Sequence, residues 1–203
     1  RGGSRYDALL DIFEPDMTSA RLDSLFADLK SWLPSLLRQA VAKQATQTLL
    51  APQGPFPIAA QRELGLQAMR ILGFDFDGGR LDISAHPFCG GVPEDVRITT
   101  RYDEDELLSA LFGVIHETGH ARYEQNLPRP WVDQPVGLAR STAIHESQSL
   151  FFEMQLGRSE PFLNRLLPAV RERFGDQPAF SSDNFVAWNQ RVKPGCIRVD
   201  AAE

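Results

Sequence analysis

The first part of the chain repeats its apolar positions at helical spacing. Between residues 6 and 50, leucine, phenylalanine and tryptophan return every three or four positions, which is typical of amphipathic α-helices. Thr18 is a suitable N-cap for the longest of these stripes. The three prolines and one glycine of residues 51–57 must interrupt the pattern. Residues 58–72 then predict another amphipathic helix, closed by Gly73. We interpret all these stripes as core-packing faces.

Beyond Gly73 the period changes from that of a helix to that of a strand. Apolar and hydroxyl-bearing side chains at positions 96, 98, 100 and 102 alternate with Arg97, Thr99 and Arg101. Turn-forming residues occupy positions 77–79 and 90–91. Residues 81–102 therefore predict a small antiparallel sheet or hairpin, whose edge we expect beside the next helix.

Helical periodicity returns after this segment and continues almost to the end. Asp103 is a good N-cap for a helix that should run to about Asn126, and the acidic residues of positions 103–106 suit its first turn. Further helices are predicted over residues 138–156, 161–174 and 182–190, and a short strand over 196–199. The predicted fold is mainly α, a single helical domain over residues 1–203 with one small sheet.

Composition narrows the classes of function. The 203 residues are 42% hydrophobic and 24% charged, as in globular domains, and their net charge of −6 argues against nucleic acid or an anionic membrane as a partner. No apolar run is long enough to cross a membrane, and the polar start does not resemble a signal peptide. The only cysteines, Cys89 and Cys196, exclude a disulfide-dense scaffold. We therefore expect a cytoplasmic protein.

The segment His116-Glu117-Thr118-Gly119-His120 carries the clearest chemistry. Two histidines four residues apart on a helix lie only about 40° apart around its axis, so His116 and His120 can share one metal ion. Glu117 lies to one side of that pair, where it can take a proton from a metal-bound water and later pass it to the leaving amine. This is the HExxH arrangement of metallopeptidases.

A polar helix face with two exposed histidines is the simpler alternative, and three features weaken it. The motif follows a long apolar run, where unpaired polar groups are costly to bury. Gly119 destabilises a helix by about 1 kcal/mol relative to alanine, so something must approach it closely. The chain has just four histidines, and two of them lie in this motif.

A catalytic zinc site needs a third protein ligand and an open position for water. A metzincin would have a third histidine at position 126, which is Asn126 here. Glu124 lies about 12 Å along the helix from His116 and is too far away. Glu146, on the next predicted helix, fits better and would give the gluzincin arrangement, although the adjacent His145 is a competing ligand. His145 is otherwise a satisfied buried histidine, a partner of a ligand, or a substrate contact.

Five segments, in order, resemble motifs of the carboxypeptidase Taq family of zinc-dependent carboxypeptidases. They are His86-Pro87-Phe88 (HPF), residues 95–99 (DxRxT), 116–120 (HExxH), 145–148 (HES/GQ) and 197–201 (the start of IRxxAD). All four histidines of the chain fall within them. The resemblance covers the chain from about Tyr6 onward. It departs from the family pattern at Ala202, where the last motif would have aspartate.

The resemblance implies a helical, grooved gluzincin-type fold with a small sheet beside the metal helix. It implies removal of C-terminal residues from peptides, zinc or cobalt bound by His116, His120 and Glu146, Glu117 as the base, and a homodimer. It also implies members more than twice this length, so we expect this chain to be their metal-binding middle portion. By itself such a portion should bind zinc with little peptidase activity, because the oxyanion donor would come from elsewhere.

A carboxypeptidase must also bind a terminal carboxylate, which suits the planar fork of arginine. Arg97 and Arg198 are candidates, with structural salt bridges as the alternative for each, for Arg97 with Asp95. His86 either lines the substrate site or holds the turn at Pro87. Two rival functions remain open: endopeptidase or aminopeptidase activity at the same site, and an inactive fragment that only binds zinc or a partner.

Overall fold

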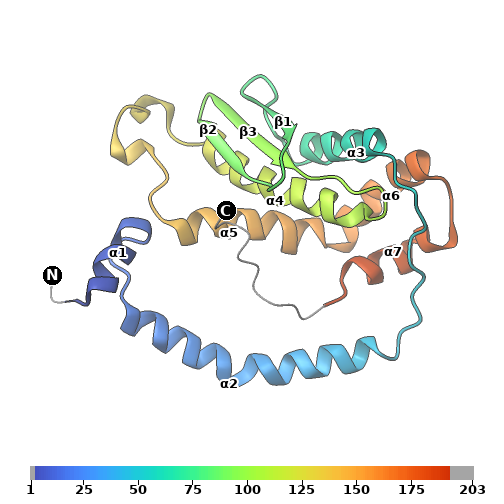
Figure 1. Cartoon of the computed structure of the whole chain (residues 1–203), viewed down its shortest axis with the longest axis horizontal. Helices are drawn as coiled ribbons and strands as arrows, with labels where there is room; N and C mark the ends of the chain where they lie inside the picture. Colours follow the sequence, from blue (N-terminus) through green and yellow to red (C-terminus); the bar gives the residue numbers. More distant parts are fainter. Residues whose placement is uncertain (1–2, 193–203) are drawn as a thin grey trace.

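The computed structural model describes residues 3–192. Its first two helices, α1 (Arg5–Phe13) and α2 (Ser19–Gln44), form an arm that runs beneath the rest of the chain (Figure 1). The Thr18 side chain accepts a hydrogen bond from the Arg21 amide, which confirms the predicted N-cap. No residue of either helix is buried. The prediction that their apolar stripes pack in the core is therefore wrong for the described chain, because neither helix lies against that core.

The remaining elements form a layered body around one central helix. Helix α3 (Ile58–Ile71) and the strands β1 (Gly79–Ile83), β2 (Cys89–Val92) and β3 (Asp95–Thr100) lie along α4 (Leu107–Gln125) (Figure 1). Apolar side chains of α4 contribute to two clusters: one with the sheet and α3, and one with α6 (Glu160–Phe174) and α7 (Ser182–Asn189). Burial on both sides therefore holds α4 rigidly.

The predicted sheet is present, but it is mixed rather than antiparallel. Its strand order is β1-β3-β2, with β2 antiparallel and β1 parallel to β3. The sequence pattern predicted strand structure in this segment, but the turn that it predicted at residues 90–91 is wrong, because these residues lie within β2 and pair with β3. It did not show that β3 inserts between the two earlier strands, and this insertion makes the β1–β3 pair parallel.

Helix α4 begins later than predicted. Its N-cap is Glu106, whose side chain accepts a hydrogen bond from the Leu108 amide. The predicted cap, Asp103, instead accepts one from the Asp105 amide at 2.9 Å and so stabilises the turn before the helix. The helix ends at Gln125 with Asn126 as its C-cap, in agreement with the predicted end at about Asn126.

The predicted helix over residues 138–156 is divided in the structure. A 3-10 turn (Pro135–Gly137) comes first, α5 (Thr142–Leu150) follows, and a π-helical segment, η3 (Phe151–Gly157), continues α5. Helices α6 and α7 match their predicted ranges closely. The strand predicted over residues 196–199 lies outside the described residues. Within residues 3–192, no helix is long and apolar enough to cross a membrane.

Candidate metal centre

Helix α4 presents His116 and His120 on one face, with their ring centroids 5.1 Å apart. This follows from their spacing, since residues four apart lie one above the other on a helix. Both rings are largely buried, with 23% and 15% of their side chains exposed. The sheet, α3 and α5 contact the same helix, so the histidines project from a fixed base.

Gly119 allows α5 to approach this face closely. A Cβ atom on Gly119 would lie 2.6 Å from the Ser149 Cα and 2.7 Å from the Gln148 carbonyl oxygen. Such distances leave no room for any side chain, which confirms the close approach expected from the sequence. Ser149 is fully buried at this crossing, and Glu146 lies almost one turn before it on α5.

The crossing brings the Glu146 carboxylate to the two histidines. Its Oε2 atom lies 3.2 Å from the His120 Nε2 and 3.8 Å from the His116 Nε2. Within residues 3–192, these are the only three His, Cys, Asp or Glu side chains whose ligand atoms all lie within 4.8 Å of one another. Two imidazole nitrogens and one carboxylate oxygen match the donors of catalytic zinc sites, so the residues fit a transition metal.

His116 is held from behind by Glu153 of the π-helical segment. The His116 Nδ1 lies 3.0 Å from the Glu153 Oε2, and the other Glu153 oxygen accepts a 3.0 Å bond from Arg158. Burial lowers the pKa of His116, but the Glu153 hydrogen bond and the neighbouring carboxylates outweigh it and raise the pKa. We did not predict Glu153 from the sequence. The available signal was its spacing of seven residues from Glu146, about two turns along one helical face.

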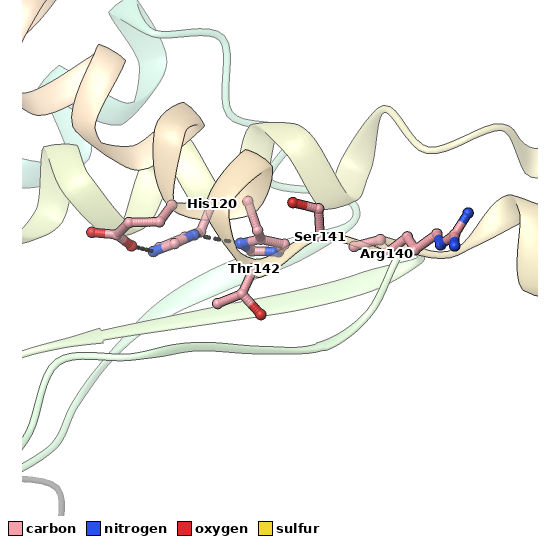
Figure 2. Close-up of a pocket in the computed structure, with 7 residues that line it drawn as sticks. His120, Arg140, Ser141 and Thr142 are labelled. Atoms are coloured by element: carbon pink, nitrogen blue, oxygen red, sulfur yellow. Dashed lines mark hydrogen bonds and ion pairs between the residues drawn. The ribbon is translucent and has the colours of Figure 1, made fainter. Parts of the chain in front are cut away.

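His120 is held by a longer chain of side chains. Its Nδ1 lies 2.6 Å from the His145 Nδ1, and the His145 Nε2 lies 2.6 Å from the Glu124 Oε1. Figure 2 shows dashed contacts on both sides of the His120 ring, to Glu146 and to His145. Burial, followed by the neighbouring His145 and His116, lowers the pKa of His120 to about 4. The structure therefore places His145 beside His120 rather than among the metal-facing groups.

The start of α5 is tied to the end of α1. Glu14 accepts hydrogen bonds from the Ser141 hydroxyl at 2.7 Å and from the Ala143 amide at 2.8 Å. Both bonds lower the pKa of Glu14, and the bond from the Ala143 amide has the larger effect. Ser141 also lines a cavity of ≈ 220 Å³ with His120 and Glu146 (Figure 2). Glu14, which the sequence did not single out, thus fixes the helix that carries Glu146.

Glu117 follows His116 in α4, and only 7% of it is exposed. Burial raises its pKa to about 7, with the charge of Glu146 acting in the same direction. Both Glu117 and His116 line an open cavity of ≈ 870 Å³, together with Arg101 and Trp188. A buried carboxylate of raised pKa beside a metal-binding set is placed to exchange protons near neutral pH.

The family model of the carboxypeptidase Taq (M32) metallopeptidases matches residues 1–203. The chain belongs to this family. It is 43% identical to carboxypeptidase 1 of Bacillus subtilis, over 98% of this chain and 40% of that protein. It is also 43% identical to thermostable carboxypeptidase 1 of Thermus thermophilus, over 99% of this chain and 40% of that protein. It superposes on Trypanosoma cruzi metallocarboxypeptidase 1 with a TM-score of 0.93 at 56% identity, over 98% of this chain and 40% of that one. The chain thus spans about two fifths of these M32 relatives.

Arg97 and His86, which belong to two further M32 motifs, make contacts outside this cavity. Arg97 is exposed and forms a 2.6 Å ion pair with Asp95, the structural alternative considered from the sequence. His86 is also exposed, and its backbone carbonyl accepts a hydrogen bond from the Thr99 hydroxyl at 3.2 Å. Neither lines the cavity beside Glu117. Arg198 lies outside the described residues.

Arg101, which was not predicted from the sequence, lines that cavity. The alternation of residues 96–102 assigned Arg97 and Arg101 to one face of a strand. Strand β3 ends at Thr100, so Arg101 no longer follows the alternation.

The crossing at Gly119 gives a stability prediction for this M32 chain. Gly119→Ala should destabilise the fold by about 1 to 3 kcal/mol through overpacking, although alanine favours a helix by about 1 kcal/mol. It should also weaken metal binding by the His116, His120 and Glu146 set, because α5 must shift and carry Glu146 away. Urea unfolding and zinc titration measure the two effects.

Gly113→Ala is the matched control on the same helix. A Cβ there would meet only the Thr100 hydroxyl, at 3.5 Å, an ordinary contact. This change should leave stability unaltered or raise it by up to about 1 kcal/mol. If both alanine variants are equally stable, the close crossing does not restrict position 119.

Proposed function

We propose that this chain carries the active site of a zinc-dependent carboxypeptidase, with His116, His120 and Glu146 as the metal ligands and Glu117 as the general base. The observation that carries the proposal is the convergence of both Nε2 atoms on the Glu146 carboxylate. The donor set favours zinc, and cobalt would also fit it. Family membership and the names of its relatives support cleavage at the carboxyl end of peptides.

Bound zinc would polarise a carbonyl group and lower the pKa of a coordinated water. The residues of the chain supply the proton transfers. Glu117 takes the proton from the attacking water as the new carbon–oxygen bond forms, and it gives a proton to the amine as the carbon–nitrogen bond breaks. Its burial raises its pKa to about 7, which suits both steps.

The ≈ 870 Å³ cavity is the proposed place for the substrate, because it has Glu117 and His116 on one wall. Arg101 and Arg191 line it as well. Positive charge at this position suits a peptide end that carries a carboxylate. Arg97, already paired with Asp95, is a poor candidate for that contact.

The polarity of cleavage tests this function. The intact, zinc-loaded protein should release the last residue from an N-acetylated peptide with a free C-terminus and should spare the same peptide ending in an amide. Mass spectrometry of the products distinguishes the possibilities. Internal cleavage of both peptides would establish an endopeptidase instead. Release of the first residue from an unblocked peptide alone would establish an aminopeptidase, and no hydrolysis would indicate a metal-binding chain without catalysis.

Elemental analysis of the purified protein will identify the metal, which we expect to be zinc. Homodimeric assembly and a cytoplasmic location stay predictions, to be checked by sedimentation and by cell fractionation. Low peptidase activity of these 203 residues alone also stays a prediction.

A further inference from the structure

We propose that Glu124 is a positioning residue that acts through His145 to hold His120 in the tautomer and orientation that metal binding requires. This inference rests on the proposed role of His120 as a ligand. Glu124 was rejected as a ligand from the sequence because of its distance along the helix. The structure gives it another task at the far end of the Glu124–His145–His120 chain.

The direction of the hydrogen bonds follows from one requirement. If the His120 Nε2 gives its lone pair to a metal, the proton of the neutral ring is on Nδ1. That N–H must then donate to the His145 Nδ1, 2.6 Å away. With Nδ1 accepting, the proton of the neutral His145 ring is on Nε2, which donates to the Glu124 Oε1 at 2.6 Å. Each of the three groups then has one defined role.

The surroundings keep these three side chains in line. Glu124 and His120 lie four residues apart on α4 and so share a face, and His145 reaches them from α5. The Tyr123 ring packs edge-on against the His145 ring, with centroids 5.2 Å apart. About a quarter of the Glu124 and His145 side chains is exposed, so both are held mainly by protein.

The two proposed histidine ligands are therefore supported in different ways. His116 contacts a carboxylate directly, through Glu153. His120 reaches its carboxylate only through a second imidazole. Loss of Glu124 leaves the His145 ring free to adopt its other tautomer, in which Nδ1 carries a proton that faces the Nδ1–H of His120. Because two N–H groups then face each other, that arrangement disfavours the tautomer of His120 that binds metal. Glu124 therefore affects His120 without contacting it.

The test compares Glu124→Ala, Glu124→Gln and His145→Ala in the intact protein, with Glu63→Gln as an exposed control. Zinc affinity is measured by competition with a chelator, and geometry by the visible spectrum of the cobalt-loaded protein. Glu124→Ala and His145→Ala should each weaken zinc binding about 10- to 100-fold, the usual effect of losing a ligand's support. Both should change the cobalt spectrum. Glu124→Gln, which keeps an acceptor oxygen, should retain most of the affinity.

The double variant Glu124→Ala/His145→Ala should bind zinc no more weakly than the weaker single variant, because both residues act along one path. Additive losses, or wild-type zinc affinity and cobalt spectrum in Glu124→Ala, would overturn the proposal. A lower unfolding midpoint of metal-free Glu124→Ala with unaltered zinc affinity would also overturn it, since that result marks a purely structural residue. His120→Ala separates this failure from failure of the proposed function: if it keeps full zinc affinity, the metal-site assignment itself is wrong.

Discussion

Glu117→Gln is expected to lower peptide turnover by about 10² to 10⁴-fold, the usual contribution of a general base. Glutamine keeps the shape of the side chain but cannot take the proton from the attacking water. The metal should stay bound, because the proposed ligands are His116, His120 and Glu146. Steady-state hydrolysis of a peptide with a free C-terminus, with zinc content measured on the same sample, tests both parts.

Glu63→Gln is the control, since Glu63 is an exposed glutamate of α3 that does not line the cavity. Its turnover should equal that of the wild type. Near-normal turnover in Glu117→Gln would assign the base to another residue. Loss of zinc from Glu117→Gln would instead show that Glu117 takes part in holding the metal.

Glu117→Gln should also change how the stability of the metal-free protein depends on pH. The folded-state pKa of Glu117 is raised to about 7 from its ordinary value of 4.5, chiefly by burial. Below pH 4.5 the group is protonated in both states, and its contribution to stability is intact. As the pH rises from 4.5 to 7 the unfolded state releases its proton first, so stability is lost. Glu117→Gln should flatten this fall and stabilise the metal-free protein at pH 7, as urea unfolding at several pH values would show.

Glu146→Ala is expected to remove bound metal, and with it all metal-dependent turnover. Two imidazoles alone leave a zinc site one protein ligand short, and within residues 3–192 no other carboxylate joins the metal-binding set. Zinc content after dialysis should fall as far as it does in His116→Ala. Both losses should exceed that of Glu124→Ala, which removes only a support of His120.

Glu172→Ala provides the matched control, because 80% of that side chain is exposed on α6. It should retain a full complement of zinc. If Glu146→Ala keeps full zinc while Glu124→Ala loses it, the ligand assignment is wrong. If Glu146→Ala, Glu124→Ala and Glu172→Ala all retain the same full amount of zinc, the metal site lies elsewhere in the protein.

The sequence by itself was most informative where the structure depends on local backbone geometry. The helical period predicted α3, α4, α6 and α7, and a spacing of four residues put His116 and His120 on one face. The cost of a glycine inside a helix correctly predicted a close neighbour at Gly119, which proved to be the backbone of α5. The preference for Glu146 over His145 needed more than spacing, and the family motif HES/GQ supported it.

Only the tertiary structure determined which distant groups meet. Glu153 reaches His116 from a π-helical segment, and His145 connects Glu124 to His120 across two helices. Glu14 reaches the start of α5 from 127 positions earlier in the chain. The parallel β1–β3 pair and the unburied face of α2 were likewise set by where whole elements pack. Periodicity specifies which face of a helix or strand is apolar, because backbone geometry repeats locally. The element that meets this face depends on the packing of the entire chain, which no single stretch of sequence encodes.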